Sequence, residues 1–555
     1  MEARPCQIIE FFNGTKQMMI PLFQRGYEWK EKEWETLWND ILERYERFDE
    51  KSDVSHFTGA IVTSPARSVP VGVSKHLVID GQQRLTTIAV LLCAIRSVCE
   101  ADSKQVRRIT KLLVNEDDDG LDYYKILPTQ PDRPSFRALL DDPEAAPDSL
   151  FKAAFKFFQK KLRGKDTDDK PIDVLRFFDT VQNRINVVMI HLGESDDPYL
   201  IFESLNAKGA PLTQGDLVRN YLLLRIHTQD QQAVYDKHWL PIQDRLGANL
   251  PEFIRQYLVM QWGEDVPKGE VYAVLKRRIV DLDDSEIPAQ VARLSHFSAF
   301  YKRIVDPTAG DGSPTEVLEG LQRIQRWEVS TSHPLLLKLF GLHSEGKLGT
   351  AAFRHCLKMI ESFAVRRAIC GVPTNQLKRI FITLTKELNP DHPVESLLAG
   401  LTSGQLGRRW PTDDEFEQAW LVYRAYASPI DRCRFILESL ERLHPHKEPA
   451  SFEKVSIEHV LPQNPDEDWY RDLGPTTDSQ REAWAHTIGN LTITAYNGEL
   501  SNAGFTRKKK IFRESHFEMN RYFEPLTRWD AEAIQQRTKS LFPLAKRLWP
   551  RSVGT

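Results

Sequence analysis

The chain has 555 residues, of which 41% are hydrophobic and 27% are charged, and its formal net charge is −4. These values are typical of a globular protein with room for about three or four domains, and they exclude wholesale disorder and a polybasic surface. The six cysteines are scattered and include no C-x-x-C pair, which disfavours a disulfide framework or a zinc ribbon and indicates a reducing compartment.

Hydropathy and local charge add two expectations. The longest plain apolar run, Ile88–Ile95, is far below the roughly 20 residues that cross a bilayer, and the N-terminus lacks a signal-peptide pattern. We therefore expect a cytoplasmic protein with no membrane partner. Residues 501–555 hold 12 Lys/Arg against 5 Asp/Glu. This basic end favours an anionic partner, and a solvated helical surface is the alternative.

The first part of the chain predicts a mixed α/β domain. Residues 18–29 are typical of a short strand and turn, and residues 31–48 have the helical spacing of apolar side chains. Strands are predicted at 56–64, 77–80 and 184–192, and helices at 85–100, 199–209 and from Gly215. Residues 101–180 read as mostly helical. Helical periodicity then continues from about 230 to 440, and a mixed pattern with a basic helix begins near 445.

The stretch LVIDGQQRLTT places Asp80, Gly81, Gln82, Gln83 and Arg84 between a predicted strand and a predicted helix. Such a corner exposes the free N–H groups of a helix N-terminus, which bind anions, and a glycine lets a phosphate approach the backbone. Arg84 supplies a planar fork suited to phosphate oxygens, while Asp80 can hold a metal or a ribose hydroxyl. The alternative is a tight turn in which Arg84 pairs with Asp80. No P-loop or G-x-G-x-x-G motif occurs, so a nucleotide site here is of another type.

Two further polar clusters accompany this corner. In PLFQRGYEW, Gln24 and Arg25 lie next to aromatic residues and can stack on a base or bind phosphate, or the aromatics can simply pack into the core. In FESLNAKGAPLTQGDLVRN, the residues Asn206, Lys208 and Gly209 precede Asp216. By itself this stretch predicts a capped helical hairpin with Asp216 near the second N-terminus.

The C-terminal region carries a constellation suited to phosphodiester cleavage, in which a base activates water and a divalent ion stabilises charge on phosphate. The adjacent pair in SIEHVLPQN supplies both, with His459 as proton acceptor and Glu458 as metal ligand. Asn490 can brace the loop that aims His459. The candidates for completing the metal shell and the remaining active-site position are Asn497 and Asn502, and those for binding DNA phosphates are Lys508, Lys509 and Lys510.

The three N-terminal motifs, in this order, resemble the N-terminal half of the GmrSD family, prokaryotic defence proteins that include SspE and BrxU. The resemblance implies a ParB/sulfiredoxin-like α/β fold. It also implies that the Asp80–Arg84 corner binds and hydrolyses a nucleoside triphosphate, with Gln24 and Arg25 facing it. Which triphosphate (GTP, UTP, CTP or ATP) stays open.

The ordered set EH…GN…N…N…KKK resembles a ββα-metal HNH nuclease fold in its Cys-free version, which forms the C-terminal half of the same family. The fold class expected is therefore multidomain α+β, with residues 1–228 as sensor, 229–440 as helical middle and 441–555 as HNH nuclease domain. The segment VRRAICGVPTNQLKRIF (365–381) also resembles the GmrSD family. Its Arg366 and Arg367 can contact DNA or an interdomain acid, and salt bridges within the helical domain are the alternative.

Together these features predict a modification-dependent DNA endonuclease of the type IV restriction kind, acting in antiphage defence. An N-terminal NTPase and sensor domain controls a C-terminal nuclease that requires Mg²⁺ or Mn²⁺. The expected partners are double-stranded DNA, modified for example by glucosylation or phosphorothioation, a nucleoside triphosphate, and a second copy in a possible homodimer. A nucleotide-switched DNA-binding protein without cleavage, and an RNase or toxin, are the alternatives.

Overall fold

The structure is a computed structural model that describes residues 2–22, 24–47, 56–65, 72–101, 103–193, 213–308, 312–404, 407–445, 451–465, 469, 478–496, 500 and 502–551. The chain divides into two compact units, one of Met1–Leu240 and Tyr272–Ala292, the other of Pro241–Val271 and Arg293–Thr555. Most of the helical middle thus shares a unit with the C-terminal region. The predicted domain boundaries after residues 228 and 440 stay predictions.

The first unit contains a six-stranded mixed sheet in the order β1-β6-β3-β4-β2-β5. Its strands are β1 (Glu2–Gln7), β2 (Lys16–Met19), β3 (His56–Pro65), β4 (Ser74–Asp80), β5 (Ile126–Leu127) and β6 (Ile185–His191). Pairing is antiparallel for β1 with β6 and β3 with β4, and parallel for β3 with β6 and for β2 with both β4 and β5. The strands predicted at 56–64, 77–80 and 184–192 are confirmed as β3, β4 and β6, whereas β1 and β5 were not predicted.

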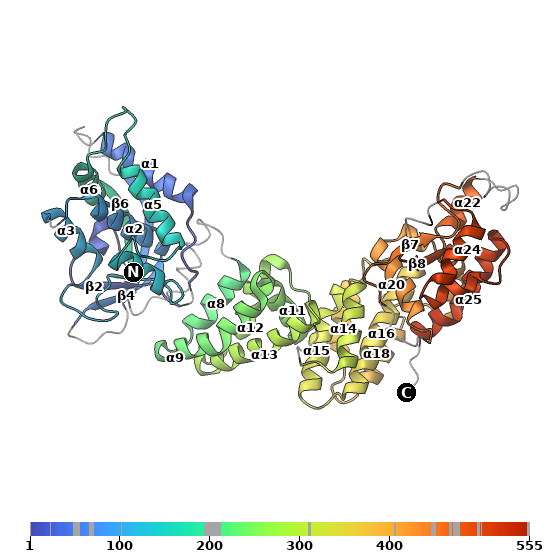
Figure 1. Cartoon of the computed structure of the whole chain (residues 1–555). Helices are drawn as coiled ribbons and strands as arrows, with labels where there is room; N and C mark the ends of the chain where they lie inside the picture. The colour runs from blue at the N-terminus through green and yellow to red at the C-terminus, as the bar shows by residue number, and fades with distance from the viewer. Residues whose placement is uncertain are drawn as a thin grey trace. The chain divides into compact units, whose positions relative to one another are not determined.

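Helices cover this sheet and supply most of the core of the first unit (Figure 1). They are α1 (Glu31–Glu46), α2 (Gln82–Val98), α3 (Lys104–Leu113), α4 (Arg133–Asp141), α5 (Leu150–Leu162) and α6 (Val174–Asn183). Helix α2 is apolar nearly all round and is buried from Leu85 to Ile95, as an unbroken apolar run predicts. Helix α1 is amphipathic and buries Trp38, whose ring stacks on Phe177 with centroids 4.7 Å apart. The predicted helix 199–209 lies outside the described residues.

The middle of the chain is helical, as predicted. Its helices are α8 (Gln214–Leu224), α9 (Thr228–Val234), α10 (Leu240–Leu246), α11 (Leu250–Trp262), α12 (Val271–Ile279), α13 (Ile287–Val305), α14 (Thr315–Arg326), α15 (His333–Ser344), α16 (Thr350–Ile369), α17 (Leu377–Glu387), α18 (Pro393–Thr402), α19 (Asp413–Val422) and α20 (Ile430–Glu441). Within the described ranges, no helix is both long and apolar enough to span a membrane.

The C-terminal region contains a two-stranded antiparallel sheet among helices (Figure 1). It consists of β7 (Ser456–His459), α22 (Asp478–Ala485), the 3-10 turn η9 (Ile488–Asn490), β8 (Leu491–Thr494), α24 (Phe505–Glu514), η10 (Glu518–Phe523) and α25 (Ala531–Leu548). Phe505 and Phe512 of α24 pack with Phe523 and Trp529 in one buried cluster. This cluster fixes the helix against the segment that follows it.

Candidate functional sites

The N-terminal corner has the backbone that its sequence predicts. Strand β4 ends at Asp80, and Gly81 adopts φ 89° as the residue that precedes α2. A Cβ at Gly81 would stand 2.9 Å from Cγ1 of Ile61 and 3.2 Å from the carbonyl oxygen of Ala60. Both the positive φ and the lack of space therefore require glycine here. The first turn of α2, with its free N–H groups, begins directly after it.

Arg84 lies in that first turn, and its guanidinium is held against strand β3. Its Nη1 donates a 2.9 Å hydrogen bond to the carbonyl of Ala60. Gly59 makes room for it, because a Cβ there would come within 2.7 Å of Arg84 Nη2. Burial lowers the pKa of Arg84, and the nearby Asp80 carboxylate opposes this shift. The guanidinium is therefore a cation held in a restricted, partly desolvated position.

The two glutamines Gln24 and Gln83 join the QRGYEW segment to the DGQQR corner. Gln24 Nε2 donates to the carbonyls of Val78 (2.7 Å) and Ile79 (2.8 Å) on β4. Gln83 Nε2 donates to the carbonyl of Gly26 at 2.8 Å. These side chains were predicted as ligand donors, and the structure instead uses their amide nitrogens to hold two segments together.

The remaining residues of the corner lie close to Gln24 and Gln83. Burial raises the pKa of Asp80, whereas the backbone N–H of Gly81 and the guanidinium groups of Arg84 and Arg25 lower it. Arg25 Nη1 pairs with Glu28 Oε2 at 2.8 Å. Gln82 is half-buried at the start of α2. The structure thus brings all the predicted corner residues together.

Of the third polar cluster, Asn206, Lys208 and Gly209 lie outside the described residues. Asp216 has a structural partner: its backbone N–H donates to Thr213 Oγ1 at 3.1 Å, and its carboxylate accepts from the Thr213 N–H at 3.2 Å. This reciprocal pair is a capping box at the start of α8, as the sequence predicted for the second helix of a hairpin.

The C-terminal constellation is built on strands β7 and β8. In their antiparallel register, Glu458 lies opposite Thr492 and His459 lies opposite Leu491. Asn490, the last residue of η9, directly precedes β8. Pairing of the two strands therefore brings together residues that are about thirty positions apart in sequence.

Glu458 is buried and forms an ion pair with Lys508 of α24. The Lys508 ammonium also donates to the carbonyl of His459 at 2.8 Å, and its side chain is 0% exposed. Burial raises the pKa of Glu458, and the charge and hydrogen bond of Lys508 oppose that shift. The expectation that Lys508 lies on the surface and contacts DNA phosphates is therefore corrected: its ammonium is directed inward and occupied by Glu458.

His459 lies in an aromatic and cationic environment. Its Nε2 is 3.4 Å from Nδ1 of His486, and its Nδ1 is 3.4 Å from Nε2 of Gln463. The ring of Tyr426 meets it edge-on with centroids 4.3 Å apart. Burial lowers the pKa of His459 to about 4, and His486 and Lys508 reinforce the shift. The imidazole is accordingly neutral near pH 7.

Asn490 braces the backbone that follows His459. Its Oδ1 accepts from the Leu461 N–H (2.8 Å) and from Nε1 of Trp529 (2.9 Å). Its Nδ2 donates to the carbonyls of Leu461 and Ala485, both at 2.9 Å. The side chain is 0% exposed. All four contacts agree with the predicted bracing role.

The other predicted residues of this region have different environments. Asn497 lies outside the described residues. Asn502 is exposed and stands shortly before α24. On that helix Lys510 is exposed, whereas Lys509 is half-buried and donates to the carbonyl of Leu526 at 2.7 Å. Within the described part of the chain, no group of three or more His, Cys, Asp or Glu is placed to hold a metal ion.

Sequence analysis missed the residues that surround the catalytic candidates. His486 and Trp529 were not singled out, and Lys508 was assigned to DNA instead of to Glu458. One signal for His486 was present, since it lies four residues before Asn490 in the same segment. For Trp529 no local signal existed, because it reaches Asn490 only through the packing of the C-terminal helices.

The paired arginines of α16 are buried, and Arg366 forms a salt bridge within the helical middle, as the alternative interpretation expected. Arg366 donates to the carbonyl of Trp549 and pairs with Asp413 at 2.7 Å. Arg367 donates to the carbonyls of Gly407 (3.0 Å) and Arg409 (2.8 Å). Their hydrogen bonds stabilise the second unit, and the two guanidinium groups are therefore not available for a contact with DNA.

Comparisons with known proteins identify the family to which the chain belongs. Residues 8–223 match the N-terminal domain of the GmrSD restriction endonuclease, and residues 410–544 match the C-terminal domain of GmrSD restriction endonucleases. A search of curated proteins finds no match. The two matched ranges contain the DGQQR corner and the Glu458–His459 strand in the predicted order, and the chain belongs to the GmrSD family of restriction endonucleases.

Proposed function

We propose that this restriction endonuclease is modification-dependent and gated by a nucleotide. In this proposal the DGQQR domain, with a ParB/sulfiredoxin-like fold, binds and hydrolyses a nucleoside triphosphate and senses modified DNA. The C-terminal region acts as an HNH-type, ββα-metal nuclease that cuts or nicks the DNA. Such a gate keeps a nuclease silent on host DNA, because only a ligand that favours the active state shifts the equilibrium.

The observation that carries the nuclease assignment is the arrangement around β7. Glu458 and His459 end a strand whose exit is braced by Asn490, and helix α24 packs behind it through Lys508. Two strands and a following helix with an acid, a histidine and a bracing asparagine are the parts that an HNH-type site needs. Asn490 is a positioning residue in this scheme, since its four hydrogen bonds all go to the protein itself.

The donor set at Glu458 fits a hard divalent cation such as Mg²⁺, which binds through one or two carboxylates and keeps several waters. Only one Glu458 oxygen is engaged by Lys508, so the other can serve as a ligand. Asn502, or Asn497, would contribute an amide oxygen. When bound, the cation would stabilise negative charge on the phosphate.

His459 has the protonation state of a proton acceptor. With its pKa lowered to about 4, the ring is neutral at physiological pH and a nitrogen lone pair is available. An incoming phosphodiester carries negative charge, which raises that pKa toward the operating pH and strengthens the base. His486, 3.4 Å away, helps to hold the imidazole in place.

The QRGYEW segment, which is hydrogen-bonded to β4 and the DGQQR corner, has two atoms that a nucleotide could pair with. In the described part of the chain, Gln24 Oε1 and Arg25 Nε are buried and have no hydrogen-bond partner. A buried polar group without a partner destabilises the folded protein. A ligand that forms a hydrogen bond with that group removes this cost, which favours binding. The guanidinium of Arg84 and the N-terminus of α2 would face the phosphates.

The test is plasmid cleavage by wild type, His459→Ala and the matched control His516→Ala, which changes an exposed histidine. Each enzyme is incubated with plain DNA, glucosylated DNA, phosphorothioate DNA or RNA. Every substrate is tested with Mg²⁺, Mn²⁺ or EDTA, and with or without each triphosphate. We expect cleavage of one modified DNA, with a divalent ion and a triphosphate, to be lost in His459→Ala alone. Undiminished cleavage by His459→Ala would remove the nuclease assignment, and cleavage of RNA alone would favour the RNase alternative.

Hydrolysis of triphosphate in the same reactions tests the sensor. Arg84→Ala is expected to abolish hydrolysis and, with it, modification-dependent cleavage. Cleavage that persists with no turnover of any triphosphate would reduce the N-terminal domain to a DNA-binding module.

A further inference from the structure

The connection between α19 and α20 lies beside the candidate nuclease site. It contains the 3-10 turn η8 (Ala425–Ala427). The backbone N–H of Tyr426 in this turn donates to the carbonyl of His486 at 3.3 Å. The N–H of Ile488 donates to the carbonyl of Tyr423, also at 3.3 Å. These two hydrogen bonds hold the connection against the segment that leads into β8.

Tyr426, His459 and His486 form one aromatic cluster. The ring of Tyr426 is nearly parallel to that of His486, with 9° between the planes and 5.6 Å between the centroids. It meets His459 at 75° with centroids 4.3 Å apart, and His486 meets His459 at 82° with centroids 5.5 Å apart. Aromatic rings pack favourably at such steep angles. The imidazole of His459 is therefore in contact with two rings, of which that of Tyr426 is the nearer.

Hydrogen bonds alone fix the ring of His459 poorly. Its two nitrogens lie 3.4 Å from His486 Nδ1 and 3.4 Å from Gln463 Nε2, which is longer than the roughly 2.7–3.2 Å of an ordinary hydrogen bond. A histidine that acts as a base is commonly oriented by a carboxylate or a backbone carbonyl at its second nitrogen. Among the residues that the structure describes, neither group is hydrogen-bonded to this ring. Packing against Tyr426 therefore contributes to its orientation.

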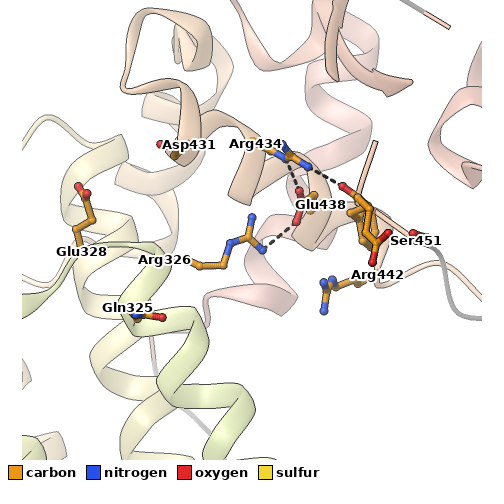
Figure 2. A pocket seen from close by; sticks show the side chains of 10 residues that line it. Gln325, Arg326, Glu328, Asp431, Arg434, Glu438, Arg442 and Ser451 are labelled. Carbon is orange, nitrogen blue, oxygen red and sulfur yellow. Dashed lines mark hydrogen bonds and ion pairs between the residues drawn. The ribbon is translucent and has the colours of Figure 1, made fainter. Parts of the chain in front are cut away.

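Contacts with other helices hold the connection at both of its ends. In α19, Trp420 is 0% exposed and its Nε1 donates to the carbonyl of Thr538 in α25 at 3.1 Å. Figure 2 shows an anchor of α20, where Glu438 accepts from Arg434 of the same helix (2.7 Å) and from Arg326 of α14 (2.9 Å). Because both flanking helices are fixed, the connection presents its tyrosine ring at one defined place beside the site.

We propose that Tyr426 is a positioning residue of the nuclease site, in which its ring packs against His459 and sets the orientation of the imidazole. This role deepens the proposed function and rests on it, since it requires His459 to act on the phosphodiester. The nuclease domain expected from the sequence, 441–555, lacks the connection, whereas the matched range of the GmrSD C-terminal domain, 410–544, includes it. The site is thus completed by a residue that precedes the two strands and the helix carrying the other side chains.

The first test compares full-length wild type, Tyr426→Leu, Tyr426→Phe, His459→Ala and the control Phe452→Leu. Phe452 is, like Tyr426, a half-buried aromatic residue of the second unit, and its ring stacks on Phe517 with centroids 5.8 Å apart. Plain, glucosylated and phosphorothioate plasmids are cleaved with Mg²⁺ and triphosphate, under single-turnover conditions at increasing enzyme concentration. Such a series separates the maximal rate from the enzyme concentration that gives half of it.

We expect Tyr426→Leu to lower the maximal rate about 10- to 100-fold, because a small displacement of a base weakens its action strongly. The half-saturating concentration should stay nearly constant, since DNA binding does not depend on the orientation of one ring. Tyr426→Phe keeps the ring and should restore most of the rate. A wild-type rate in Tyr426→Leu, with His459→Ala inactive, would overturn this role alone, and so would a loss in Tyr426→Phe as large as in Tyr426→Leu. Undiminished cleavage by His459→Ala would instead remove the proposed function.

A second test follows the contact itself, without metal, DNA or catalysis. Histidine Cε1 is labelled with ¹³C, and the NMR signal of His459 is identified by its absence from His459→Ala. This signal should shift in Tyr426→Leu, because the ring current of the tyrosine is lost, and stay near its wild-type position in Tyr426→Phe and Phe452→Leu. An unmoved signal in Tyr426→Leu would overturn the proposal. If Tyr426→Leu does not fold, Tyr426→Met fills the space without a ring, and the same two results are expected of it.

Discussion

Lys508 and Glu458 form an ion pair that is shut off from solvent, with side chains 0% and 6% exposed. Each charge is desolvated, and the pair compensates for that cost only as long as both partners are present. The carboxylate proposed as a metal ligand is therefore also part of the packing of α24 against β7. Its chemistry and the stability of the C-terminal region are coupled.

This coupling predicts a non-additive effect of two substitutions. Lys508→Met should lower the free energy of unfolding by about 3–5 kcal/mol, because a buried carboxylate is left without its partner. Lys508→Met combined with Glu458→Gln should recover most of that loss while cleavage stays absent. Thermal and urea unfolding of the wild type, of Lys508→Met, of Glu458→Gln and of the double variant measure the coupling free energy between the two side chains. A double variant as unstable as Lys508→Met alone would contradict the pair's role.

Asn490 offers a second prediction, since its side chain holds the exit of β7. In Asn490→Asp the Oδ1 acceptor contacts can remain, but the two donations to the carbonyls of Leu461 and Ala485 are lost. An anion would then face two carbonyl oxygens. We expect a loss of about 2–4 kcal/mol and of most cleavage activity.

The readout that separates positioning from chemistry is the metal dependence of the remaining activity. Asn490→Asp should leave the concentration of Mg²⁺ for half-maximal cleavage nearly unchanged, because its contacts go to backbone and Trp529. A large change in that concentration would mean that Asn490 acts on the ion.

Gly59 gives a prediction for the N-terminal corner. It has φ 107°, and a Cβ there would lie 2.7 Å from Nη2 of Arg84. Gly59→Ala should therefore displace the guanidinium and reduce triphosphate hydrolysis toward the level of Arg84→Ala. Gly72→Ala is the matched control, because Gly72 also has a positive φ of 119° but has no atom within 4 Å of an added Cβ. Equal hydrolysis by both glycine variants would show that the position of Arg84 is unimportant.

His333 predicts how stability depends on pH. Burial lowers its pKa from 6.5 to about 4; the negative charge of Glu252 opposes this shift to a smaller extent, and the positive charge of Arg255 reinforces it. Between those values the unfolded chain binds a proton that the folded chain does not, so stability falls as pH is lowered from about 6.5 to 4. His333→Gln should remove at most about 3 kcal/mol of that dependence.

The measurement is the difference in unfolding midpoint between wild type and His333→Gln at pH 7.5 and at pH 4.5. The difference should shift in favour of the variant at the lower pH. A difference that does not change with pH would show that His333 is protonated to the same extent in both states.

Local pattern was enough to predict much of the fold. Short stretches rich in apolar and β-branched residues located β3, β4 and β6, and helical periodicity, broken only by loops, located the helical middle. The edge strand β1 was missed because Glu2–Gln7 is mostly exposed and shows no alternation, so only its pairing with β6 defines it. The same reasoning explains β5, which is two residues long.

The sequence by itself indicated where the two candidate sites lie, because the DGQQR and EH…GN motifs are local and ordered along the chain. Only the tertiary structure decided what each side chain does there. Lys508 lies in a basic run that predicts a surface, yet the packing of α24 turns its ammonium onto Glu458. Trp529 reaches Asn490 from thirty-nine positions away. Charge and spacing identify candidates, but burial assigns their partners, since a desolvated polar group must find one within the fold.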